Sequence, residues 1–67
     1  MDDAKTRVFE ERKELMTKIN KLTLFVQTNK AFNQLSKKMR RLLKRQLRIM
    51  KRYLSILTKR LRVWEDK

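Results

Sequence analysis

The chain has 67 residues and a formal net charge of +13, and it contains no glycine, proline, cysteine or histidine. This length allows one small domain, whose core is marginal by itself, and the lack of cysteine excludes disulfides as extra stabilisation. The missing glycine and proline make tight β-hairpin turns unfavourable, so we predict an all-α protein. Without histidine and cysteine we expect neither a transition-metal site nor a cofactor.

The charges are distributed unevenly along the chain. Five of the seven acids precede Leu15, and the other two are Glu65 and Asp66. Twelve lysines and arginines lie between Lys37 and Arg62, with no acid among them. Because charge of one sign repels itself in a compact state, we expect an anionic counterpart in the functional state.

The first residues, MDDAKTRVFEERKE, lack the apolar region of a signal peptide, and no apolar run approaches the length of a membrane-spanning helix. The sequence therefore predicts a cytoplasmic protein.

The first predicted helix covers about residues 3–28. Apolar residues recur on it at steps of seven, four, three and four, the spacing of one helix face. These residues are Val8, Leu15, Ile19, Leu22 and Val26.

The pattern breaks at QTNKAFNQLS, so we predict a connection over about residues 29–35. Asn29 and Asn33 tolerate the left-handed conformation better than most residues, and Ser36 is a good N-cap for the next helix. We expect Phe32 and Leu35 to fold over the end of the core. A short connection makes the flanking helices antiparallel, so residues 1–67 form a single helical-hairpin domain.

The second predicted helix covers about residues 36–64 and has two neighbouring seams. The first seam has apolar residues at alternating steps of four and three, as in coiled coils: Leu43, Leu47, Met50, Leu54, Leu57, Leu61 and Trp64. The second seam consists of Met39, Leu42, Gln46, Ile49, Tyr53, Ile56, Arg60 and Val63. One partner helix cannot cover so wide a face. We therefore predict self-association into a helical bundle, a dimer or higher oligomer, with the first seam in its core.

Cations occupy the side of this helix that faces away from the seams. They form a basic ridge of Arg41, Lys44, Arg45, Arg48, Lys51, Arg52, Lys59 and Arg62. At about 1.5 Å per residue the helix is roughly 43 Å long, which is enough to follow several phosphates.

Two stretches carry a resemblance to a known group of proteins: RVFEERKELMTKINKLTLFV, and LLKRQLRIMKRYLSILTKRL after it. The second matches the pattern Leu-Leu-x-x-Gln-Leu-x-x-Met-x-x-Tyr-x-x-Ile-Leu-x-x-Arg through Leu42, Leu43, Gln46, Leu47, Met50, Tyr53, Ile56, Leu57 and Arg60. Over most of its length the chain resembles short accessory proteins of tailed phages and prophages, including crAss-like phages. The resemblance implies a helical hairpin in the host cytoplasm and no known catalytic residue.

Small phage accessory proteins often counter host defences, some by sequestering nucleotide immune signals in oligomeric helical cages, and by analogy this chain is expected to do the same. It departs from the group in its charge. Relatives tend to carry mixed or acidic residues at the outward positions of the second helix, where this chain is almost entirely basic.

Three residues of the second seam, Gln46, Tyr53 and Arg60, can hydrogen-bond and are spaced by seven. We call them the polar seam residues. An arginine and a tyrosine suit recognition of a phosphate and a base. They also suit a structural role, in which the three residues fix helix register and Arg60 pairs with Glu10, Glu11 or Glu14. The sequence leaves both alternatives open.

Enzymatic activity is not expected, because the chain has no histidine or cysteine and no glycine-rich phosphate loop. Binding of an anionic nucleotide or nucleic acid is the leading interpretation. A nucleic-acid binder would lay the ridge along a phosphate backbone, whereas a nucleotide-sequestering protein would hold its ligand in a pocket between subunits. The alternatives are docking on a host defence protein and, less favoured, binding to a membrane surface as an amphipathic helix.

Overall fold

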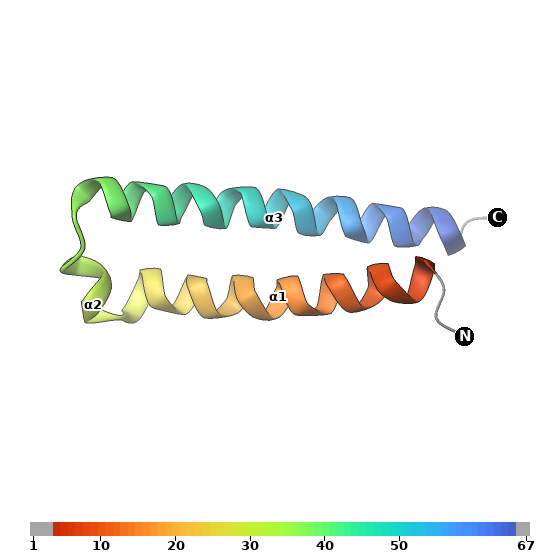
Figure 1. Cartoon of the computed structure of the whole chain (residues 1–67), viewed down its shortest axis with the longest axis horizontal. Coiled ribbons are helices and arrows are strands. Elements are labelled where there is room, and N and C mark those ends of the chain that lie inside the picture. The colour runs from red at the N-terminus through yellow and green to blue at the C-terminus, as the bar shows by residue number, and fades with distance from the viewer. Residues whose placement is uncertain (1–3, 66–67) are drawn as a thin grey trace.

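The computed structural model describes residues 4–65 as an elongated antiparallel hairpin (Figure 1). Helix α1 covers Ala4–Thr28, the single-turn helix α2 covers Lys30–Asn33, and α3 covers Lys37–Glu65. The hairpin measures 48 × 18 × 14 Å. The all-helical prediction is therefore confirmed, although the predicted start of the first helix at residue 3 lies outside the described residues.

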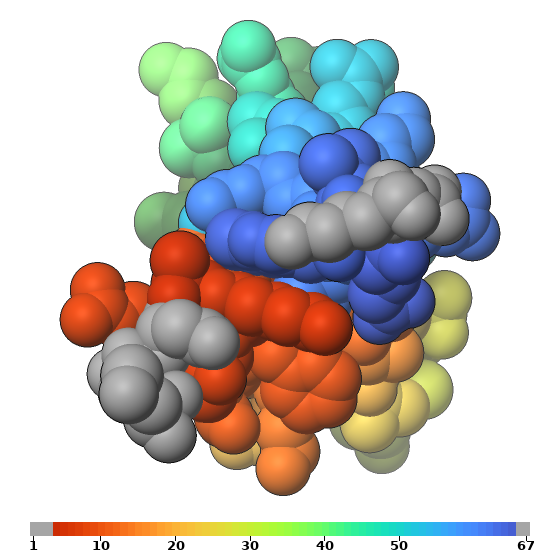
Figure 2. Space-filling view, turned by 90° about the vertical axis from the view of Figure 1, so that its right-hand side faces the viewer, coloured from red at the N-terminus to blue at the C-terminus, as the bar shows by residue number. Residues whose placement is uncertain are grey.

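The core of the hairpin lies between α1 and α3. Val8, Leu15 and Ile19 of α1 and Leu57 of α3 are buried, and Leu57 has no exposed surface. Five residues of the first seam pack against this cluster: Leu47, Met50, Leu54, Leu61 and Trp64. Seen along the axis of the hairpin, the side chains of α1 and α3 meet directly (Figure 2). The first seam is thus the interface between two helices of one chain, and its place in an oligomer core stays a prediction.

The connection contains a helical turn, α2, that the sequence pattern did not indicate. Its N-cap is Asn29, whose Oδ1 accepts a hydrogen bond from the Ala31 backbone N–H at 2.8 Å. Asn29 has an extended backbone (φ −86°, ψ 125°), and none of residues 4–65 has a positive φ. The left-handed conformation that asparagine tolerates is therefore not used here, because the side-chain cap lets the chain turn without it.

Two other features of the connection agree with the sequence. Phe32 is 95% buried and meets Phe25 edge-on, with ring centroids 5.9 Å apart and an interplanar angle of 88°. Ser36 caps α3, because its Oγ accepts a hydrogen bond from the Met39 N–H at 3.1 Å. Together these contacts close one end of the core and determine where α3 begins.

The second seam is left largely exposed by the hairpin. Its apolar residues are exposed to between 40% of the side chain, at Tyr53, and 72%, at Val63. They also include Met39, Leu42, Ile49 and Ile56. A row of this length exposed on a small protein indicates an interaction surface. None of the helices in residues 4–65 is long and apolar enough to cross a membrane.

Candidate anion-binding surface

Every residue of the basic ridge lies on α3 and is exposed. The ridge exists because the first seam turns one side of α3 toward α1, which leaves the opposite side in solvent. Lysine and arginine are good helix formers, so their density does not disturb the helix. The fold therefore presents these cations on a rigid rod rather than on mobile loops.

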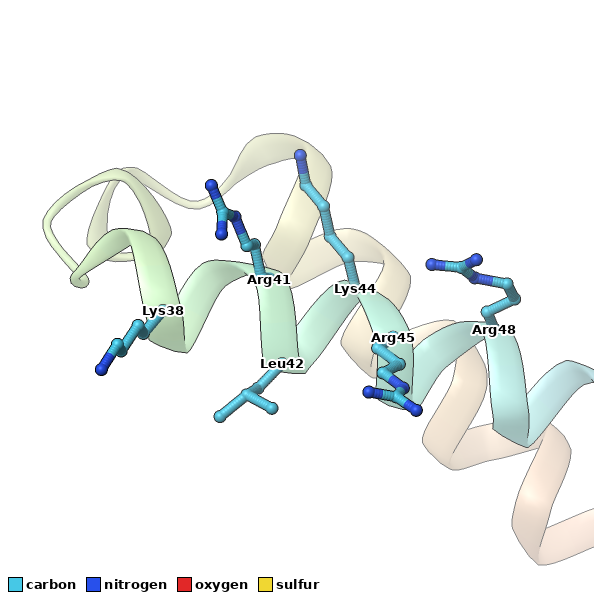
Figure 3. A pocket seen from close by; sticks show the side chains of 6 residues that line it. All are labelled: Lys38, Arg41, Leu42, Lys44, Arg45 and Arg48. Atoms are coloured by element: carbon cyan, nitrogen blue, oxygen red, sulfur yellow. The ribbon is translucent and has the colours of Figure 1, made fainter.

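The first two turns of the ridge border an open surface hollow of about 530 Å³. Its lining consists of Lys38, Arg41, Leu42, Lys44, Arg45 and Arg48. In Figure 3 the side chains of Arg41, Lys44 and Arg48 project to one side of α3, and those of Lys38, Leu42 and Arg45 project to the other. The ridge is therefore two rows of cations, and the second row lies beside the second seam.

Sequence reasoning began the ridge at Arg41 and so missed three cations that precede it. Lys38 lines the first hollow, and Lys37 and Arg40 line a smaller neighbouring one of about 160 Å³ together with Arg41 and Lys44. The signal was in the sequence, because the dense run of cations without an acid already starts at Lys37. Arg40 is half-buried, and its Nε has no hydrogen-bond partner among the described residues.

Lys44 has a second role at this end of the hairpin. Its Nζ lies 5.9 Å from the centre of the Phe32 ring, which is a cation–π distance. The same lysine thus helps hold α2 against α3 and faces the anion-binding surface. Of the ridge residues, it is the one most closely tied to the fold.

The structure separates the polar seam residues instead of bringing them together. The Tyr53 hydroxyl donates a hydrogen bond to Oε2 of Glu11 on α1, which agrees with the predicted structural role of this region. The pairing uses Tyr53, however, and not the expected Arg60. Gln46 lies within a turn of Met50, with Nε2 3.9 Å from the sulfur. Arg60 borders a different hollow, of about 340 Å³, with Val63 and Trp64.

A hydrogen bond on the opposite side of α3 explains why the second seam stays open. Arg12 Nε donates to Thr58 Oγ1 at 2.9 Å, so α1 is tied to α3 on that side as well as at Tyr53. These two hydrogen bonds resist rotation of α3 about its own axis. With α3 held in this way, the first seam faces α1, and the second seam and the ridge face outward.

This surface is rich in groups that pair with anions. Guanidinium groups form paired hydrogen bonds with phosphate oxygens, and lysines add charge without fixed geometry. Among residues 4–65 no group of three or more histidines, cysteines or acids is placed to hold a metal ion.

The model of one protein family, described as Sequestin, matches residues 2–63. No curated protein and no solved structure matches the chain. The matched residues include all of α1, α3 as far as residue 63, the second seam, the first seam except Trp64, and the whole basic ridge.

Proposed function

The chain belongs to the Sequestin family, and on that premise we propose that it is a non-enzymatic protein that sequesters an anionic nucleotide. The family name supports a sequestering function, and the many cations of α3 support an anionic ligand. A protein of this kind acts by stoichiometric binding, so it needs charge and shape but no catalytic group. We propose that it is a phage accessory protein that acts in the host cytoplasm on a nucleotide immune signal.

The observation that carries the proposal is α3 with its exposed cations and no acid before Glu65, its last residue. Burial on α3 involves the first seam, so the ridge plays no part in the core of the hairpin. Twelve cations on one helix destabilise an isolated hairpin through mutual repulsion. Selection for a stable fold alone would not place them there, whereas phosphate binding requires them.

Oligomerisation belongs to the same proposal. The exposed second seam is the surface through which hairpins associate, and an oligomer encloses a small ligand better than the open hollows of one chain. At micromolar concentration the light-scattering mass is expected to be that of a dimer or larger species. A monomeric mass under these conditions contradicts this part of the proposal.

The direct test is native mass spectrometry of the full chain purified from cells without a high-salt step. It reports the subunit number and the mass of any co-purified anion in one measurement. We expect an oligomer that carries a small nucleotide in a fixed ratio. An oligomer that takes up no nucleotide, from cells or from a panel of mono-, di- and cyclic dinucleotides at low salt, refutes the proposal.

A second candidate, binding along a DNA or RNA backbone, is favoured by the length of the ridge. It runs from Arg41 to Arg62, or about 30 Å at 1.5 Å per residue. The two candidates differ in their response to salt. Backbone binding falls steeply with salt and strengthens with strand length, whereas a nucleotide site is saturated by one small molecule.

A further inference from the structure

The second seam is symmetric about the middle of α3, which is Lys51. Its eight residues form four pairs, and the two members of each pair lie equally far from Lys51 along the chain. The pairs are Met39 and Val63 at twelve residues, Leu42 and Arg60 at nine, Gln46 and Ile56 at five, and Ile49 and Tyr53 at two. Two α3 helices that cross antiparallel at Lys51 therefore bring each second-seam residue opposite its counterpart. No polar seam residue faces itself in this register, because Gln46 meets Ile56 and Arg60 meets Leu42.

The other helix of the hairpin offers no matching row on this side. Phe9 and Met16, two of its exposed large apolar residues, lie three residues before and four after Arg12, which places them on the Arg12–Thr58 side. The second seam lies on the opposite side, where Tyr53 contacts Glu11. The best partner for the second seam is therefore the second seam of another copy.

A row of cations borders the second seam on the side away from α1. Lys38, Arg45, Arg52 and Lys59 are spaced by seven, and each immediately precedes a second-seam residue. We call them the seam-side row. Figure 3 shows two of them, Lys38 and Arg45, on the same side of α3 as Leu42 of the second seam.

Symmetry brings the two seam-side rows of a dimer together. The twofold axis of an antiparallel pair is perpendicular to the plane of the two helices, so a row above that plane on one helix is also above it on the other. Arg45 then lies only two residues, or about 3 Å along the axis, from Lys59 of the second copy. Within one chain Arg45 and Lys59 are fourteen residues apart, about 21 Å.

We propose that a second copy covers the second seam antiparallel, and that the phosphate groups of the ligand bind where Arg45 of one copy meets Lys59 and Arg60 of the other. This inference rests on the proposed anion-binding function and adds that each chain supplies half of each site. Helix axes 8–10 Å apart leave these side chains within reach of one anion. Without an anion the converging cations repel, so ligand binding and dimerisation are coupled.

Mixing two binding-deficient variants tests the shared site, with inorganic tripolyphosphate as the probe and isothermal titration as the readout. Arg45→Gln and Arg60→Gln each remove one half of both sites, and each homodimer is expected to bind about tenfold more weakly. A mixed dimer contains one site with both substitutions and one intact site. Equal mixing should therefore restore about a quarter of the high-affinity sites, because half of the dimers are mixed.

The matched control mixes Lys59→Gln with Arg60→Gln, which damage the same half of the site and should restore none. Recovery in both mixtures, or in neither, overturns the shared site. If the parent chain fails to bind tripolyphosphate and every nucleotide at low salt, the proposed function fails as well. Binding by the parent without recovery in the first mixture refutes the shared site alone.

Disulfide trapping tests the antiparallel register independently of any ligand, since the chain has no cysteine of its own. Met39→Cys mixed with Val63→Cys should form a cross-linked dimer, because the two positions lie opposite each other. Met39→Cys alone should not, because its two copies lie about 36 Å apart along the axis. Self-cross-linking of Met39→Cys indicates a parallel pair, which separates the seam-side rows and overturns the proposal.

Dimer mass in the presence of tripolyphosphate tests the coupling. At constant ionic strength, sedimentation of the parent should show dimerisation strengthened about tenfold by the anion. Arg45→Gln/Arg52→Gln should dimerise without needing the anion, whereas Lys13→Gln/Lys21→Gln, which removes the same charge from exposed positions on α1, should respond like the parent. An equal response of the two double variants contradicts the coupling.

Discussion

The two seams of α3 lie on one helix and have the same residue spacing, yet they differ in their exposure to solvent. The first seam is buried against α1, with Leu57 fully enclosed, whereas the second seam leaves six large apolar side chains 40–72% exposed. Composition alone does not explain the difference, since leucine and methionine occur in both. The difference arises because a hairpin supplies one covering helix and no more, so burial is a property of the arrangement and not of the residue.

The largest effect should come from comparing two adjacent residues, Leu57 of the first seam and Ile56 of the second. Leu57→Ala leaves a cavity in the core and should lower the free energy of unfolding by about 2–5 kcal/mol. Ile56→Ala, at a side chain 54% exposed, should cost well under 1 kcal/mol in dilute solution. Chemical denaturation followed by circular dichroism measures both.

Repeating this denaturation at rising protein concentration sharpens the comparison. If copies cover the second seam, the cost of Ile56→Ala should grow with concentration while that of Leu57→Ala changes little. Equal costs at low concentration would contradict the assignment of the first seam to the hairpin core.

The next effect concerns the exposed side of α3. Changing Arg41, Lys44, Arg45 and Arg48 to glutamine should leave helicity intact and weaken binding of anionic nucleotides at least tenfold, about 1.4 kcal/mol. The matched control changes four exposed α1 lysines, Lys5, Lys13, Lys18 and Lys21, and removes the same charge. An equal loss in both variants would mean that net charge, and not the ridge, determines affinity.

A smaller effect is expected at Ser36, the N-cap of the helix that carries both seams. Ser36→Ala removes the acceptor for the Met39 N–H and should cost about 1 kcal/mol of unfolding free energy. Ser36→Asp restores a side-chain acceptor and should recover most of it. A loss that Ser36→Asp fails to recover would show that the cap does not position α3.

The smallest effect should be at Tyr53, which belongs to the second seam but contacts α1. Tyr53→Phe removes the hydrogen bond to Glu11 at an exposed site and should cost about 0.5 kcal/mol. In a double-mutant cycle with Glu11→Gln the two losses should not add. Additive losses would show that the contact is not energetically coupled and would leave Tyr53 available to a ligand.

Periodicity was sufficient to predict most of the fold. The predicted bounds of the second helix, residues 36–64, differ from the observed Lys37–Glu65 by one residue at each end, because a serine cap is visible in sequence. Phe32 was correctly expected to cover the core end. The turn α2 was missed, since four residues are too few to show a helical period and its cap depends on one asparagine side chain.

The candidate site was less predictable. The ridge was predictable from the sequence because exposed cations follow helical spacing. Its extension to Lys37, Lys38 and Arg40 was recognised only from the surface hollows, although the cation run in the sequence already contained these residues. In the structural alternative Glu10, Glu11 or Glu14 was expected to pair with Arg60, whereas Glu11 accepts a hydrogen bond from Tyr53. Such pairings depend on how two helices slide and rotate against each other, which the pattern within one helix does not specify.

The sequence by itself determined that this protein is helical, that it forms a hairpin, and that one helix carries two apolar seams and a basic ridge. These are local properties, set by spacing, capping and the absence of glycine and proline. Only the tertiary structure decided which seam is buried and which is open. That choice depends on the rotation of α3 against α1, which is set mainly by the packing of Leu57 against Val8, Leu15 and Ile19. The hydrogen bonds of Thr58 with Arg12 and of Tyr53 with Glu11 add to it.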